Sequence, residues 1–189
     1  MGKVNNSKSS NLDFSKVNIK SLIQSILFVE EKPISLKRLA QFIPLKPTEI
    51  KKILEEIQKD YDKFELGVQL NEIADGYQLS TRANLGQFLK EFYSKKKKAS
   101  FSKAAIEAMA IIAYKQPITR VEIEEIRGAQ IGNSLQILLE RRLIKIDGRK
   151  NVVGHPLLYA TTKEFLIYFG LKSLDALPTI KEIREMELK

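Results

Sequence analysis

The side chains that most often carry out chemistry in proteins are scarce in this 189-residue chain. It has no cysteine and a single histidine, His155, which stands between Gly154 and Pro156. A chain without cysteine forms no disulfide or thiolate metal site, and one histidine cannot supply the common zinc arrangements. A histidine that acts as a general base needs a positioned partner, and the sequence offers none beside it. We therefore interpret His155 as a surface loop residue and expect no metal site.

Carboxylates cluster at two places, Glu55-Glu56 and Glu122-Glu124-Glu125, and such groups can serve as acid and base in a hydrolase. Both clusters fall in predicted helices, where they are typical of a solvated face or of the first turn. Neither a GxxxxGK(S/T) loop nor a GxGxxG loop is present, so no phosphate-binding loop is predicted. The sequence therefore predicts no catalytic residue, no cofactor and no enzymatic activity.

The net charge of +9 is unevenly distributed along the chain. Residues 1–20 carry +3 and residues 94–103 carry +5, whereas the remaining residues together carry +1. The basic character therefore belongs to a tail and a linker. The linker lysines could attract nucleic acid independently of its sequence, although a run of like charges is also typical of a solvated linker.

One pattern occurs twice, 84 residues apart, as EKPISLKRLAQF (31–42) and KQPITRVEIEEIRG (115–128). Each copy predicts a short helix, over 36–42 and 120–127, that begins after a capping Ser35 or Thr119. Gly128 is placed to end the second of these helices. An apolar helix precedes each copy and a third helix follows it. The third helix starts at Pro47 in the first half and is predicted to be capped by Asn133 or Ser134 in the second.

Each half then changes to the period-two pattern of a β-hairpin and ends in another helix. The hairpins are predicted at 67–70 with 77–81 and at 143–146 with 157–161, and the closing helices at 84–93 and 163–169. Three helices, a hairpin and a helix form the order of a winged helix-turn-helix unit. The predicted fold is thus mainly α with small β-wings, an α+β chain of two tandem winged helix-turn-helix domains.

The expected domain organisation follows from this repeat. It comprises a flexible tail (1–18), a first winged-helix domain (19–93), a basic linker (94–101), a second winged-helix domain (102–172) and a C-terminal extension (173–189). The longest apolar run, residues 108–114, is too short to cross a bilayer, and the polar N-terminal segment lacks the apolar core of a secretory signal. We therefore expect a cytoplasmic protein without a membrane partner.

Winged helices bind either DNA or other proteins. The third helix of the first unit, residues 47–63, has a net charge of −1, which suits phosphate poorly. The corresponding helix of the second unit has Asn133, Ser134 and Gln136 at its start and Arg141-Arg142 at its end, which could touch nucleic acid. Two nearly neutral units favour a protein-binding module, and a winged-helix DNA-binding regulator is the alternative.

The first helix is strongly apolar, with Leu22, Ile26, Phe28 and Val29. A unit of this size has little core to spare, so we expect most of this apolar surface to lie in the core of its own unit.

Four stretches resemble the bacterial segregation and condensation protein B family: SLIQSILFVEEKPISLKRLAQF, GVQLNEIADGYQLSTR, AIEAMAIIAYKQPITRVEIEEIRG and LLYATTKEFLIYFGLKSLDALP. The resemblance covers about residues 19–178. It implies a non-enzymatic accessory subunit of the bacterial condensin that acts in chromosome condensation and segregation during cell division. It also implies a homodimer formed mainly through the first unit, which binds the kleisin subunit (segregation and condensation protein A) and through it the SMC ATPase. The expected location is the nucleoid, with DNA contacted indirectly or weakly.

The candidate partner-binding residues lie in the second unit, which is expected to bind the kleisin: Arg127, Gly128, Arg141, Arg142, Arg149 and Lys150. The pair 127–128 matches an Ile-Arg-Gly motif of the family, and residues 148–150 match a Gly-Arg-Lys pattern that opens the second wing. A capped helix end alone would also explain an arginine followed by glycine at 127–128. The chain departs from the family pattern at His155, where arginine is usual, and over residues 129–134, which lack the usual aspartate. Both departures lie in the second unit. We therefore expect the contacts of this unit with the kleisin to differ from the family pattern, with matching changes in the kleisin itself.

Overall fold

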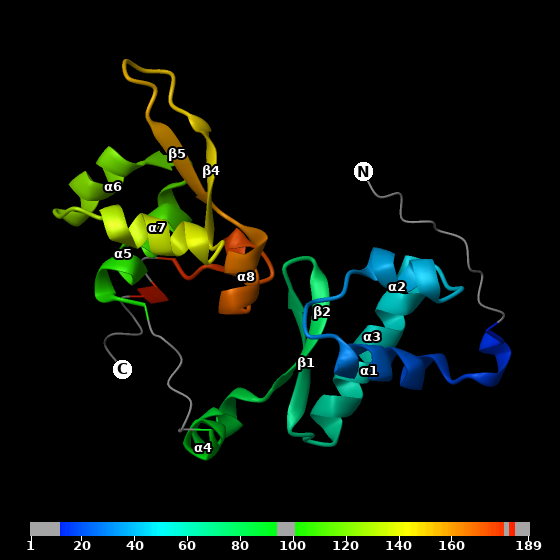
Figure 1. The fold of residues 1–189 in the computed structure, drawn as a ribbon. Helices are drawn as coiled ribbons and strands as arrows, with labels where there is room; N and C mark the ends of the chain where they lie inside the picture. Colours follow the sequence, from blue (N-terminus) through cyan, green and yellow to red (C-terminus); the bar gives the residue numbers. More distant parts are fainter. Residues whose placement is uncertain (1–11, 94–100, 180–181, 184–189) are drawn as a thin grey trace.

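A computed structural model of the chain, shown in Figure 1, describes residues 12–93, 101–179 and 182–183. These residues form two units, each with its own apolar core. One core draws on residues between 19 and 79, and the other on residues between 101 and 177. Parts of the predicted tail (1–11), linker (94–100) and C-terminal extension (180–181 and 184–189) lie outside the described residues. The prediction of two tandem α+β units is confirmed.

The first unit consists of three helices, a hairpin and a further short helix. In chain order these are α1 (Ile19–Val29), α2 (Leu36–Phe42), α3 (Pro47–Lys63), β1 (Val68–Ile73), β2 (Gly76–Thr81) and α4 (Gly86–Phe92), with 3₁₀ turns η1 (Phe14–Lys16) and η2 (Ala83–Leu85). The side chain of Ser35 accepts a hydrogen bond from the Arg38 amide, so the predicted cap of α2 is confirmed. Pro47 is the first residue of α3, also as predicted.

Helix α1 confirms only part of the predicted core, because Leu22 and Ile26 pack against it but Phe28 and Val29 do not. Ile23 and Leu27, four residues apart, are fully buried, whereas Phe28 and Val29 are 81% and 77% exposed. The expectation that Phe28 and Val29 belong mainly to the core is therefore wrong. Residues that follow each other on a helix point about 100° apart, so a helix that buries Leu27 turns Phe28 outward.

The second unit repeats this order and adds a short strand. Its elements are α5 (Lys103–Lys115), β3 (Ile118–Thr119), α6 (Arg120–Arg127), α7 (Gly132–Glu140), β4 (Ile144–Arg149), β5 (Leu157–Thr161) and α8 (Lys163–Phe169), followed by the 3₁₀ turn η3 (Leu174–Ala176). The three antiparallel strands are ordered β3-β5-β4. Strand β3 was not predicted, because two residues are too few to display a period-two pattern. Its counterpart in the first unit is a single bridge between Ile34 and Tyr77.

The predicted cap of α7 is wrong. The helix begins at Gly132, one residue before Asn133, and Ser134 is a buried residue inside it. The start is fixed instead by Ile131, whose side chain lies in the core and whose amide donates to the Glu124 carboxylate over 3.0 Å. Packing of Ile131 and a side chain from α6 therefore replace the usual capping hydroxyl or amide.

The turn of the first wing contacts the second unit. The Ala74 amide, between β1 and β2, donates to the Leu171 carbonyl after α8 over 3.0 Å. Beside it Lys172 and Glu72 form an ion pair of 3.0 Å. In Figure 1 this turn lies next to the end of α8. We call this contact the wing–α8 joint.

Candidate functional site

The six candidate partner-binding residues do not form one patch. They occupy three places in the second unit: Arg127 and Gly128 at the end of α6, Arg141 and Arg142 after α7, and Arg149 and Lys150 at the end of β4. Each pair has different contacts. The structure therefore separates the residues that could be offered to a partner from those that hold the unit together.

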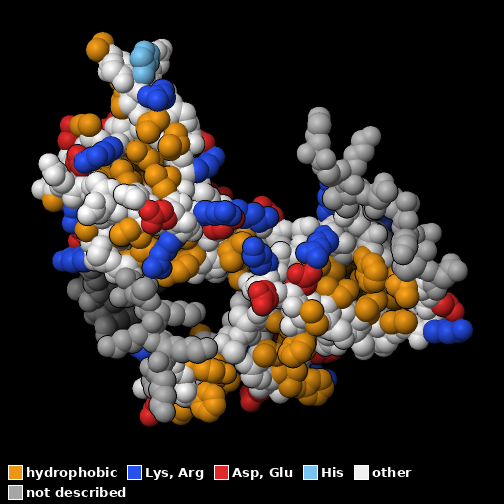
Figure 2. Space-filling model, viewed as in Figure 1, with side chains coloured by type: hydrophobic (Ala, Val, Ile, Leu, Met, Phe, Trp, Pro, Cys, Tyr) orange, Lys and Arg blue, Asp and Glu red, His pale blue; other side chains and the backbone are white. Residues whose placement is uncertain are grey.

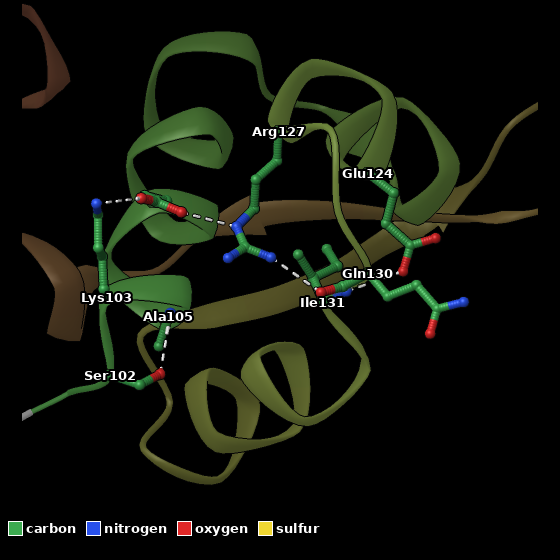
Figure 3. Close-up of polar contacts among 8 residues, drawn as sticks. Ser102, Lys103, Ala105, Glu124, Arg127, Gln130 and Ile131 are labelled. Carbon is green, nitrogen blue, oxygen red and sulfur yellow. Dashed lines mark hydrogen bonds and ion pairs between the residues drawn. The ribbon is translucent and has the colours of Figure 1, made fainter.

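The Arg127 side chain is held against its own fold, and Gly128 lies at the exposed end of α6 (Figure 3). The Nε of Arg127 donates to Glu107 Oε2 of α5 over 2.8 Å, and its Nη1 donates to the Gln130 carbonyl over 2.9 Å. The Arg127 side chain is only 17% exposed. Gly128 has a φ of 74°, the left-handed conformation typical of the residue that ends a helix. Arg127 thus connects α5, α6 and the loop before α7, and Gly128 ends α6.

Replacing Arg127 by alanine is expected to lower the free energy of unfolding by about 1.5 kcal/mol, because a largely buried charge-assisted pair loses one partner. A lysine at this position cannot reach both acceptors, so the free energy of unfolding of Arg127→Lys should lie between those of the unaltered chain and of Arg127→Ala. Urea denaturation measures the effect. Arg149→Ala is the control. Its side chain is exposed and, within the described residues, donates to the His155 carbonyl, so its loss should change stability by less than about 0.5 kcal/mol. Equal losses in both alanine variants would contradict this structural role of Arg127.

Lys150 is connected to the start of α6. Its Nζ donates to Glu122 Oε1 over 2.5 Å, and the other carboxylate oxygen of Glu122 accepts from the Thr119 amide over 2.9 Å. Thr119 caps α6 and forms the predicted capping box with Glu122. The Lys150 ammonium and the Thr119 donors lower the pKa of Glu122 to about 2. The wing is thus tied to the helix-turn-helix by a charged group.

This pKa predicts how stability depends on pH. Because the folded pKa of Glu122 lies below its ordinary value of 4.5, ionised Glu122 stabilises the fold above pH 4.5. That contribution disappears as the pH falls from 4.5 toward 2. Glu122→Gln keeps a capping oxygen but removes the charge, and should lower stability at pH 7 by about 1 kcal/mol, a value reduced for solvent exposure. The difference between the two proteins in urea denaturation should narrow as the pH approaches 2, and a difference independent of pH would contradict the prediction.

Arg141 and Arg142 follow the last turn of α7 at the surface. The guanidinium of Arg141 lies over the Phe101 ring, 4.4 Å from its centroid. Arg142 has a φ of 56°, and its carbonyl accepts a hydrogen bond of 2.5 Å from the Thr162 hydroxyl. Both side chains remain exposed to solvent. They are therefore more exposed than Arg127, whose side chain is 17% exposed.

The exposed side of α7 is poorly suited to DNA. Ser134, one of the residues considered for nucleic-acid contact, is buried, and Gln136 donates to Glu140 over 2.9 Å. The helix thus presents a carboxylate and Ile137, which is 38% exposed, beside the amides of Asn133 and Gln136, whereas a DNA-reading helix would present basic and amide groups.

Sequence reasoning missed the most exposed aromatic cluster. Phe88 and Phe92 of α4 are 73% and 80% exposed, and the following Tyr93 is 63% exposed. Helix α4 buries none of its residues and lies apart from the other helices of its unit (Figure 1). Hydrophobic side chains gather over it in Figure 2. We call Phe88, Phe92 and Tyr93 the α4 aromatic patch. The only sequence signal was three aromatics within six residues, which a buried helix would display equally well.

The described part of the chain offers no group of three or more His, Asp or Glu residues that could hold a metal ion. Within the same residues, no helix combines the length and the apolar character needed to cross a bilayer.

Comparison with known proteins gives consistent matches. Residues 21–180 match the family model described as segregation and condensation complex subunit ScpB. Segregation and condensation protein B of Syntrophotalea carbinolica is 41% identical over 170 residues, which cover 90% of this chain and 86% of the relative. The protein of the same name from Clostridium tetani is 41% identical over 165 residues, 87% of each chain. The crystal structure of ScpB from Mycobacterium tuberculosis is 25% identical, covering 86% of this chain and 99% of that one with a TM-score of 0.40.

Proposed function

The chain belongs to the segregation and condensation complex subunit ScpB family, and from this membership we propose that it is a non-enzymatic accessory subunit of a bacterial condensin. In this role it is a homodimer that binds the kleisin and, through the kleisin, associates with the SMC ATPase. It acts at the nucleoid in chromosome condensation and segregation. The observation that carries the proposal is the family match over residues 21–180, with 41% identity to a relative across 90% of the chain.

We assign the dimer contact to the α4 aromatic patch of the first domain, residues 19–93. A helix of seven residues is too short to be stable in water without packing. Exposed aromatic side chains of this size are typical of protein interfaces. A second copy of α4 and its unit would bury Phe88 and Phe92 in the centre of a two-fold interface.

We assign kleisin binding to the second domain, residues 102–172. Arg141, Arg142 and Arg149 are the candidates with exposed side chains, whereas Arg127 and Lys150 connect elements of the unit and Gly128 ends α6. Contact with DNA is then indirect or weak, in keeping with the carboxylate of Glu140 on the exposed side of α7.

The experiment is size-exclusion chromatography with light scattering, on the chain alone and mixed with the central segment of the kleisin, at physiological salt. A dimer that co-elutes with the segment is the expected result. A monomer that does not bind the segment would overturn the proposal. It would then favour a DNA-binding regulator, which should bind duplex DNA with an affinity that falls steeply with salt.

A further inference from the structure

Arg82 lies where the first wing ends and the chain turns toward α4, and its guanidinium binds the end of α3. The Nε donates to the Leu66 carbonyl over 2.6 Å, and Nη2 donates to the Tyr61 carbonyl, also over 2.6 Å. The same Nη2 forms an ion pair of 2.9 Å with the Asp62 carboxylate. The Arg82 side chain is 23% exposed. One side chain therefore connects the segment that leads to α4 with the last turn of α3.

The end of α3 is a turn that a cation stabilises. The Leu66 amide donates to the Tyr61 carbonyl over 3.1 Å and the Glu65 amide donates to the Asp62 carbonyl over 3.2 Å, which is the pattern of a Schellman motif. Its left-handed position usually belongs to glycine, but here Glu65 occupies it with a φ of 47°. Such a conformation persists when its surroundings determine it. Arg82 binds a carbonyl on each side of Glu65, and its charge suits the negative end of a helix.

The turn between Arg82 and α4 leaves the chain little freedom. The Arg82 amide donates to the Gly67 carbonyl over 3.2 Å, and the Leu85 amide donates to the Arg82 carbonyl over 3.1 Å. The Gly86 amide donates to the Ala83 carbonyl, so the 3₁₀ turn η2 continues into α4 without a gap. Leu85 lies directly beside the chain before β1, since a Cβ at Gly67 would meet its Cδ1 at 3.5 Å. The direction of α4 is therefore set at Arg82 and the turn that follows it.

Helix α4 has no other polar support within the described part of the first unit. None of its side chains forms a hydrogen bond, ion pair or ring contact with α1, α2, α3 or the hairpin there, and the Phe92 ring packs only against the adjacent Tyr93. Figure 1 shows α4 apart from these three helices. A short helix attached at one end could take many directions if that attachment were loose. Association with a second copy would then have to restrict it, at a cost in entropy.

We infer that Arg82 is a positioning residue for the homodimer. By binding the end of α3 it fixes the direction of α4, so that the α4 aromatic patch is already in place when a second copy binds. The inference rests on the proposed function, in which this patch forms the dimer contact. Arg82 acts through α4 and needs no contact with the second copy. Loss of its side chain should weaken the dimer without changing the patch itself.

The first test is the dissociation constant of the dimer of the full chain, measured by sedimentation equilibrium. Arg82→Ala should raise it at least about tenfold, because α4 must then be ordered on association. Arg82→Lys keeps the charge but cannot reach all three acceptors, so its dissociation constant should lie between those of the unaltered chain and of Arg82→Ala. The matched control is Arg38→Ala, which removes an arginine of α2 that forms an ion pair of 2.7 Å with Glu30 in the same unit. It should change the dissociation constant less than about twofold, and thermal unfolding shows whether each variant folds.

The second test measures the position of α4 itself. The chain contains no cysteine, so spin labels can be attached at Lys52→Cys in α3 and Lys90→Cys in α4, both exposed positions. The labelled chain also carries Phe88→Asp/Phe92→Asp, so that no second copy holds the helix. Pulsed electron spin resonance should give a narrow distribution of label distances with Arg82 present and with Arg38→Ala, and a broader one with Arg82→Ala. A loss of global stability alone would not broaden the distribution of a chain that is still folded.

The outcomes separate this inference from the proposed function. If the unaltered chain is a monomer at every concentration, the homodimer and the role of Arg82 both fail. If it is a dimer and Arg82→Ala dissociates no more readily than Arg38→Ala, the role of Arg82 alone is overturned. The same holds if the dissociation constant rises but the distance distribution stays narrow, because Arg82 would then act in another way than by positioning α4.

Discussion

Aspartate at both Phe88 and Phe92 is expected to convert the proposed homodimer into monomers. The two phenylalanines are 73% and 80% exposed on a helix that buries none of its own residues. Their replacement costs the single chain little, because the packing lost among the described residues is mainly the edge-on contact of the Phe92 ring with Tyr93, with centroids 4.9 Å apart. In the dimer, however, two aromatic anchors per copy would become carboxylates in a desolvated interface. We expect the dissociation constant to rise more than about 100-fold.

Light scattering and sedimentation at several protein concentrations measure the effect, and thermal unfolding shows whether the variant folds. The control is Val152→Asp/Val153→Asp, which places the same charges on exposed apolar residues of the second wing and should leave the dimer intact. Phe28 and Val29 of α1 are the other strongly exposed apolar pair of the first unit. A dimer that survives the α4 change but dissociates in Phe28→Asp/Val29→Asp would move the interface to α1.

The elements of the fold could be predicted wherever a local signal fixes them. Pro47 and the hydroxyl caps Ser35 and Thr119 mark helix starts in any context, so α2, α3 and α6 begin where the sequence places them. The start of α7 could not be found in this way, because it depends on burial of Ile131 and on a carboxylate of the neighbouring helix. That interaction exists only after α6 and α7 have packed.

The candidate site was predictable only in part, for a similar reason. The pattern Arg127-Gly128 has the same form whether the arginine faces a partner or its own fold, and only the position of Glu107, 20 residues earlier, decides between them. Exposure of Phe28 and Phe92 could not be predicted either, since hydrophobic periodicity marks apolar residues without saying which of them lack a neighbour. The wing–α8 joint depends on the contact between residues 74 and 171, which no local pattern encodes.

Alanine at Gly76 is expected to lower the free energy of unfolding by about 2 to 3 kcal/mol. Gly76 is the first residue of β2 and is buried against the segment before α2. A Cβ at this position would lie 3.0 Å from the carbonyl carbon and the Cβ of Pro33, and 3.1 Å from the carbonyl carbon of Ile34. Because two of these neighbours are backbone atoms, the segment must move as a whole. That movement would disturb the pair of hydrogen bonds between Ile34 and Tyr77 and expose Ile34, which is 4% exposed.

Gly86→Ala is the matched control for this change. A Cβ at Gly86, the first residue of α4, would meet no atom within 4 Å, and its φ of −58° suits any residue. Alanine there should leave stability unchanged or raise it by up to about 1 kcal/mol, because it restricts the unfolded chain and favours the helix. Urea denaturation measures the free energy of unfolding of both variants. Both are measured at one protein concentration, because the stability of a dimer depends on concentration. If Gly76→Ala were as stable as Gly86→Ala, the close approach of the first wing to the segment before α2 would be contradicted.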